Sequence, residues 1–326
     1  MYKVGVVADL SNNGSIHQST FLKAVNDAKE TLFKEKTDIE FVLENDFASF
    51  EGGQNAAQKL IDKNVDCVIG HFSSSAASGA LPVYKNKNTP LFLPASTVVN
   101  LTQDYNNAFR ICSNDKHLTS FIVDYFSRKN NKENLYLYRD NTIHASFLYD
   151  LLKERLSNVT ELKLDEESEI KENVLYIGTY KSSVYFINEL HLKDKYNCNI
   201  YFTDDALHPK LVIDTSNISN RIKIFGFDHP LNYKNASEIC HRYFKRHQSF
   251  PNTYYLETYA GFEIINKLIL LGKRLTISAI NELSYKTVIG DFKFKKGESE
   301  VQHINMWYLE NAQLKTILHD KETRFN

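Results

Sequence analysis

The stretch VIGHFSSS, residues 68–75, decides the fold of this chain. It completes a short apolar run, Cys67–Gly70, and leads into a segment of helical length, Ser75–Lys87. A continuous apolar run is typical of a strand that is covered on both faces, and serine is a preferred residue at helix N-termini. The stretch therefore predicts a strand–turn–helix unit of an α/β protein, with hydroxyl and backbone N–H groups gathered at the turn.

The same rhythm continues along the chain. Further strands are expected at Lys3–Ala8, Ile39–Glu44, Leu91–Pro94, Asn134–Tyr138, Val174–Gly178, Asn199–Thr203 and Lys223–Gly226, and helices at Ser15–Phe33, Gly53–Lys63, His117–Lys129, Ala145–Leu156 and Ser182–Tyr196. Helices at Ala236–His247, Thr253–Leu271 and Thr276–Ser284 should precede antiparallel strands at Phe292–Phe294, Ile304–Leu309 and Leu314–Leu318. Such alternation predicts parallel sheets with helices on both faces, and 326 residues suffice for two domains.

Composition argues against several classes of function. With 39 basic and 40 acidic residues the formal net charge is −1, which gives no electrostatic reason to expect nucleic acid as a partner. No run approaches the roughly 18 apolar residues that span a bilayer. The chain begins with a strand-like MYKVGVVAD, so we expect a cytoplasmic protein as written, or a periplasmic or extracellular lipoprotein whose signal peptide was removed.

Signatures of catalysis and of metal binding are missing from the sequence. Neither a G-x-S-x-G elbow, nor a G-x-G-x-x-G after the first strand, nor a phosphate-binding P-loop is present, so we expect no enzyme and no cofactor. His71 is expected to be a hydrogen-bonded structural histidine. The four cysteines lie in or beside apolar segments and show no zinc spacing, which favours buried thiols over a metal site or disulfides: Cys67, Cys112, Cys198 and Cys240.

Polar residues at the ends of the expected strands are the candidates for ligand binding, because ligands of open α/β sheets bind there. Ser73, Ser74 and Ser75 could bind a carboxylate at the helix N-terminus, or one of them could simply cap the helix. Asp204 and Asp205 could pair with a ligand ammonium, or cap the next helix. Other groups that could line the same site follow strands or stand near their ends: Phe72, Ala95, Thr97 and Tyr180.

Four motifs carry a family resemblance: VIGHFSSS at 68–75, LPAST at 93–97, TYAG at 258–261 and GDFKFKKGE at 290–298. In this order and spacing the chain resembles the type I periplasmic binding proteins, and within them the leucine/isoleucine/valine-type amino-acid receptors of ABC transporters. The resemblance runs from Val4 to about His303. It implies a Venus-flytrap of two Rossmann-like lobes that closes on its ligand, with residues 1–115 and 229–295 in lobe I, residues 116–228 and 296–326 in lobe II, and crossovers near residues 113–116, 228–232 and 295–301.

The resemblance also implies roles for particular residues. Ser74 and Thr97 would bind the ligand carboxylate, and the Ala95 carbonyl would accept from its ammonium. Tyr180 would stack over the ligand, and Asp205, with Asp204 as second choice, would pair with the ammonium.

The chain departs from the family pattern at several positions. His144-Ala145 stands where the family has Tyr-Gly, so His144 joins the candidates. Ala48 and Ser73 stand where some relatives form a small disulfide, which favours a reducing compartment.

Three functions compete at this stage. The first is a solute receptor that delivers an amino acid or a derivative to an ABC permease. The second is a cytoplasmic sensor of the same fold that acts through a protein partner. The third, least favoured, is an enzyme that has adopted the fold.

Overall fold

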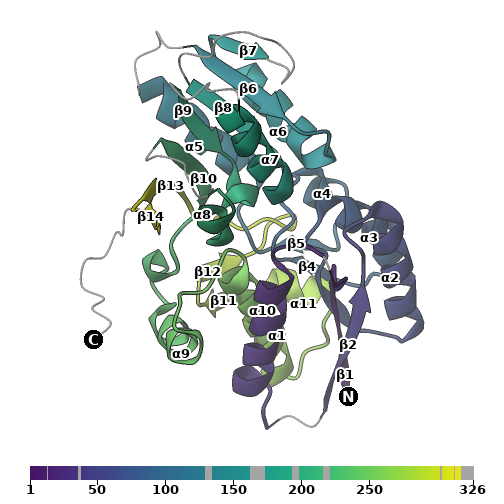
Figure 1. Ribbon diagram of the computed structural model, residues 1–326. Coiled ribbons are helices and arrows are strands. Elements are labelled where there is room, and N and C mark those ends of the chain that lie inside the picture. Colours follow the sequence, from purple (N-terminus) through teal and green to yellow (C-terminus); the bar gives the residue numbers. More distant parts are fainter. Residues whose placement is uncertain are drawn as a thin grey trace. The chain divides into compact units, whose positions relative to one another are not determined.

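The computed structural model describes residues 1–12, 14–35, 38–128, 134–161, 173–192, 198–215, 221–301, 303–311 and 313–316. The chain divides into two compact units (Figure 1). Unit 1 comprises Met1–Asn114 and Pro230–Gln302, and unit 2 comprises Asp115–His229 and His303–Lys321.

Unit 1 is built on a five-stranded parallel sheet with the strand order β2-β1-β3-β4-β5. Its strands are β1 (Tyr2–Ala8), β2 (Ile39–Asn45), β3 (Cys67–Gly70), β4 (Leu91–Leu93) and β5 (Ala108–Arg110). Its helices are α1 (Gln18–Leu32), α2 (Phe50–Asp62), α3 (Ser74–Asn86), α4 (Asn100–Gln103), α9 (Ser237–His247), α10 (Tyr255–Leu270) and α11 (Ile277–Glu282), with a short 3-10 turn η2 (Pro230–Asn232) and an antiparallel hairpin of β11 (Ser284–Thr287) and β12 (Gly290–Lys293).

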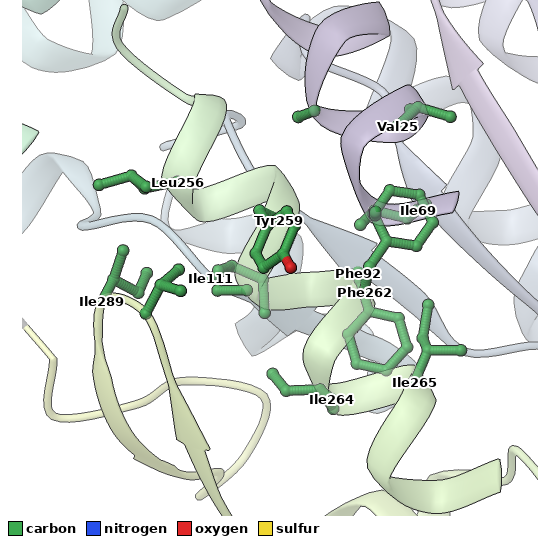
Figure 2. Packing of buried hydrophobic residues seen from close by; sticks show 14 of the residues in the cluster. Val25, Ile69, Phe92, Ile111, Leu256, Tyr259, Phe262, Ile264, Ile265 and Ile289 are labelled. Atoms are coloured by element: carbon green, nitrogen blue, oxygen red, sulfur yellow. The ribbon is translucent and has the colours of Figure 1, made fainter. Parts of the chain in front are cut away.

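Both faces of this sheet are buried, which explains the continuous apolar character of its strands. Along β3, Ile69 belongs to the cluster that contains residues of α1 and α10, whereas Val68 belongs to the cluster formed with α2 and α3. Figure 2 shows the first of these clusters, where Ile69 and Phe92 of the sheet lie among Val25 of α1 and Phe262 of α10.

Helices α2 and α3 of unit 1 approach each other through glycines. A Cβ atom on Gly53 would lie 2.0 Å from the Ala76 carbonyl oxygen, and one on Gly79 would lie 2.0 Å from the Phe50 carbonyl oxygen. These distances exclude any side chain at either position, so the second helix layer of unit 1 depends on both glycines.

Unit 2 is built on a seven-stranded mixed sheet with the order β14-β13-β10-β9-β8-β6-β7. Its parallel strands are β6 (Leu135–Arg139), β7 (Val159–Glu161), β8 (Asn173–Ile177), β9 (Asn199–Phe202) and β10 (Ile222–Phe227). As predicted, β13 (Ile304–Glu310) and β14 (Gln313–Thr316) pair antiparallel. The helices are α5 (Asp115–Arg128), α6 (Ile143–Arg155), α7 (Tyr180–Leu192) and α8 (Lys210–Asp214), with a 3-10 turn η1 (Asp204–Ala206) after β9.

The structure corrects the expected elements in a few places. Strands β5 and β7 were not predicted, because each has only three residues, too few to show a strand periodicity. The helix expected to reach Ser284 ends at Glu282, and β11 begins at Ser284. Residues 129, 193–196 and 317–318 of the expected elements lie outside the described residues.

The chain passes from one unit to the other after Asn114, after His229 and between residues 301 and 303. Residues 296–301 belong to unit 1 because the Glu298 carboxylate and the Gly297 carbonyl are hydrogen-bonded to Arg110 of β5.

Candidate functional site

His71 organises the carboxyl ends of the strands of unit 1. Its side chain is fully buried, with Nδ1 3.0 Å from Asp46 Oδ2 and Nε2 3.0 Å from the Tyr84 hydroxyl. Its backbone has a φ of +54°, and its carbonyl accepts a hydrogen bond from the Ser96 hydroxyl at 2.5 Å. The prediction of a hydrogen-bonded structural histidine is confirmed: the side chain joins the segment after β2 to α3, and the backbone carbonyl joins the segment after β4.

The three serines that follow His71 divide into two roles. Ser73 is the N-cap of α3: its Oγ accepts from the Ala76 N–H at 3.5 Å and donates to the Ala48 carbonyl at 3.1 Å. The Ser73 hydroxyl is therefore occupied within unit 1. Ser74 and Ser75 lie in the first turn of α3, partly exposed, and their hydroxyls make no hydrogen bond among the described residues. First-turn N–H groups have no partner within a helix, so this end of α3 has free donors for an anion.

The loop after β4 brings two further candidates to the same edge of the sheet. Ala95 and Thr97 are nearly buried, with 5% and 6% of their surface exposed. Between them, the Ser96 hydroxyl donates to the carbonyls of His71 and Phe72, which joins this loop to the serine loop. Ser96 thus joins the loop that carries Thr97 to the loop that leads into Ser74 and Ser75.

Phe72 closes the apolar side of this group. Its ring packs edge-on against Phe21 of α1, with centroids 4.9 Å apart, and against Tyr254 at 5.6 Å. Phe72 remains partly exposed, so it contributes both to the core and to the surface beside the serines.

In unit 2, acidic residues surround His144 at the start of α6. His144 Nδ1 lies 3.7 Å from Asp115 Oδ1, and the Asp115 side chain is fully buried. Burial opposes protonation of His144, but the carboxylates of Asp115, Asp205 and Asp204 outweigh it and raise the pKa of the imidazole to about 10. At neutral pH His144 is therefore an imidazolium beside three acidic side chains.

Asp204 and Asp205 form the turn η1 after β9, and they differ in exposure. Asp204 is buried, whereas Asp205 is partly exposed and its carboxylate accepts no hydrogen bond from the described residues. Burial raises the pKa of Asp205, and the neighbouring His144 cation opposes that rise. Asp205 is therefore the carboxylate of this group that is open to an external cation.

Tyr180, at the start of α7, is oriented by a hydrogen bond from its hydroxyl. The hydroxyl donates to Asp214 Oδ2 at 2.7 Å, and the ring lies edge-on to His208 with centroids 5.9 Å apart. Burial and the Asp214 carboxylate raise the pKa of the phenol above its usual value. The ring is partly exposed, so it remains a candidate wall for a ligand.

Two further acidic residues belong to this part of unit 2. Asp140, two residues after the expected strand Asn134–Tyr138, accepts hydrogen bonds from Thr142, the Thr179 N–H and Ser182, and so positions the loops after β6 and β8. Asp115 was missed from the sequence, because it is an ordinary acidic residue in a first helical turn.

Three structural findings bear on other classes of function. All four cysteines are buried thiols, as predicted. Within the described residues, no group of histidine, cysteine and acidic side chains could hold a metal ion. Among the helices described, none combines the length and apolar character needed to cross a membrane.

The two units have the fold of type I periplasmic binding proteins. A structure of the substrate-binding protein LivJ from Streptococcus pneumoniae in complex with isoleucine shares 16% identity over 97% of this chain and 99% of that one, with a TM-score of 0.85. The leucine-binding protein LivK from Thermotoga maritima shares 16% identity over 97% and 98%, with a TM-score of 0.82. A solute-binding protein from Rhodopseudomonas palustris in complex with 3,4-dihydroxybenzoic acid shares 16% identity over 97% and 95%, with a TM-score of 0.75.

The sequence comparison agrees with the fold. Residues 1–154 match the model of the family described as periplasmic binding protein. No curated protein sequence matches the chain significantly. The resemblance predicted from the four sequence motifs is confirmed, and so is the two-lobed α/β fold class.

Proposed function

We propose that this protein is a solute-binding protein that captures a small amino-acid-like ligand and presents it to the permease of an ABC importer. The observation that carries the proposal is the first turn of α3, where Ser74 and Ser75 keep free hydroxyls beside unpaired backbone donors. A helix N-terminus with such donors can bind an anion, and the carboxylate of an amino acid is such an anion.

The Thr97 loop supports the same assignment. Thr97 lies in the loop that the Ser96 hydroxyl joins to the serine turn, so its hydroxyl and N–H belong to the same group of donors. The Ala95 carbonyl is the proposed acceptor for an ammonium on the same ligand.

Unit 2 supplies the proposed partner for the ammonium. Asp205 is partly exposed, accepts no hydrogen bond from the described residues, and stands in an acidic group beside the His144 cation. An ammonium beside Asp205 would offset a further negative charge of this group. Tyr180, with its hydroxyl held by Asp214, is the proposed aromatic wall.

The ligands of the structural neighbours fit this division of roles. Isoleucine and 3,4-dihydroxybenzoic acid, bound by two of those proteins, share a carboxylate, but only isoleucine has an ammonium. We therefore assign recognition of the carboxylate to unit 1, and discrimination between amino acids and other acids to Asp205 and its neighbours.

A ligand screen tests the proposal. We would follow thermal unfolding in the presence of each amino acid and of aromatic acids, since a ligand at 100 times its Kd stabilises by about 2.7 kcal/mol. The best amino acid would then be titrated calorimetrically beside its amide, which lacks the carboxylate, and its deaminated acid, which lacks the ammonium. Both analogues should bind at least about tenfold more weakly.

The matched variants are Thr97→Ala and Lys296→Ala. Thr97→Ala should weaken binding, whereas the exposed Lys296 should be neutral. A screen in which no compound with a carboxylate stabilises the protein would refute the proposal. Recovery of a chemically altered ligand after incubation would instead indicate an enzyme.

A further inference from the structure

All three nitrogens of the buried Arg110 guanidinium, at the end of β5, donate hydrogen bonds. Its Nε donates to Glu298 Oε1 at 2.9 Å, one terminal nitrogen donates to the Ser96 carbonyl, and the other donates to the Val98 carbonyl at 2.7 Å. A buried guanidinium is stable only when its donors are satisfied and its charge is paired. The hydrogen bonds to Arg110 therefore also fix the positions of these three acceptors.

Two of the acceptors belong to the proposed ligand loop. The carbonyls of Ser96 and Val98 flank Thr97, so the guanidinium fixes the backbone on both sides of that residue. From another direction, the Ser96 hydroxyl is bound to the carbonyls of His71 and Phe72. The loop at residues 95–98 has no regular secondary structure of its own, so these contacts define its conformation.

Glu298 links the guanidinium to the places where the chain passes between the units. Its carboxylate also accepts from the Thr102 hydroxyl at 2.5 Å and from Asn114 Nδ2 at 3.2 Å. Asn114 is the last residue of unit 1 before the first passage, and Glu298 lies five residues before His303, where unit 2 resumes after the third passage. The Glu298 carboxylate thus joins the segment before the third passage to the segment before the first.

The backbone reinforces this connection. The Arg110 N–H donates to the Gly297 carbonyl at 2.8 Å. Gly297 has a φ of +75°, and a Cβ atom there would lie 2.2 Å from the Ala108 carbonyl oxygen. Only glycine fits, so the segment that carries Glu298 is pressed directly against β5.

We propose that Arg110 and Glu298 are positioning residues that couple the conformation of the 95–98 loop to the first and third passages of the chain. A change of backbone conformation at either passage moves Glu298 or its partner Asn114, and the guanidinium transmits that displacement to the carbonyls around Thr97. Occupancy of the loop in turn biases the conformation of the passages. The inference rests on the proposed function only in treating this loop as part of the ligand site.

Amide hydrogen exchange of the ligand-free protein tests the coupling. In Glu298→Gln, peptides covering residues 94–99 and 111–116 should exchange about tenfold faster or more, since a charged hydrogen bond is replaced by a neutral one. In the same variant, peptides from β1 and α1 should exchange at the wild-type rate. Glu300→Gln, the matched control on an exposed side chain of the same segment, should exchange at the wild-type rate in all peptides. Thr102→Val is the milder second variant. Acceleration throughout unit 1, or in neither peptide, would overturn the coupling.

Titration of the same variants with L-isoleucine as probe separates the coupling from the ligand assignment. Glu298→Gln should bind L-isoleucine about tenfold more weakly than the wild type, and Glu300→Gln should bind it with the wild-type affinity. Arg110→Lys keeps the charge but has one nitrogen in place of the three that bind Glu298, Ser96 and Val98, so it should resemble Glu298→Gln. Wild-type affinity in Glu298→Gln despite a mobile loop would overturn the proposed role. A wild-type protein that binds no amino acid would refute the proposed function, and the exchange experiment would still decide the coupling.

Discussion

Replacing His71 by asparagine should destabilise unit 1 without disturbing unit 2. Asparagine tolerates the left-handed backbone conformation that His71 adopts, with its φ of +54°, so the substitution isolates the side-chain contacts. Its side chain is too short to reach both Asp46 and Tyr84. The hydrogen bond to the Asp46 carboxylate contributes about 1.5–3 kcal/mol and the one to the Tyr84 hydroxyl about 1 kcal/mol, so the expected loss is about 3 kcal/mol.

The two units allow the loss to be located. Trp307, the only tryptophan of the sequence, lies in unit 2 and donates to the Phe227 carbonyl at 2.7 Å. Tryptophan fluorescence therefore reports the unfolding of unit 2, whereas far-ultraviolet circular dichroism reports both units. For a unit of this size the loss corresponds to roughly 10 °C in Tm.

In His71→Asn, the unfolding transition seen by circular dichroism should move to lower temperature, and the transition seen by tryptophan fluorescence should move less. Tyr84→Phe, which removes one hydrogen bond and leaves the imidazole in place, should cost about 1 kcal/mol by the same measurement. If the free energy of unfolding of His71→Asn lies within about 1 kcal/mol of the wild-type value, the hydrogen bonds of His71 to Asp46 and Tyr84 do not hold the loops together, and the reasoning fails.

Three further predictions concern the ligand, pH and packing. Asp205→Asn should weaken an amino-acid ligand by about 2–5 kcal/mol in a calorimetric titration, and an unchanged Kd would remove Asp205 from the site. Burial raises the pKa of Glu257 to about 7, so its favourable contribution is complete below the unfolded pKa and is lost as pH rises through 7. Glu257→Gln should therefore be more stable than wild type at pH 8, by up to about 3 kcal/mol, with no such gain at pH 4; equal denaturation midpoints at pH 8 would contradict this. Gly53→Ala places a Cβ atom 2.0 Å from the Ala76 carbonyl oxygen and should cost more than about 2 kcal/mol, whereas the exposed Gln54→Ala should cost less than about 0.5 kcal/mol in the same unfolding experiment.

Much of the fold was accessible from local sequence. The strands β3 and β10 were predicted to within one residue at either end, because apolar runs of this kind form only where both sheet faces are covered. Helix α3 was predicted to begin one residue later than it does, since a run of serines offers several equivalent caps and only packing selects Ser73. Strand β5 was missed because three residues carry too little periodicity, and its place in the sheet depends on pairing with β4.

For the candidate site, the sequence determined which chemical groups end each strand: the serines after β3, the Ala-Ser-Thr step after β4 and the paired aspartates after β9. Only the tertiary structure decided how these groups are used. It engages the hydroxyl of Ser73 within unit 1 and leaves Ser74 open, and it charges His144 by placing Asp115 beside it, although 29 positions separate the two in the chain. It also joins Arg110 to Glu298 across 188 positions. Local sequence specifies strands and caps through short-range sterics and burial, whereas charge pairing depends on distances in space that only the folded chain creates.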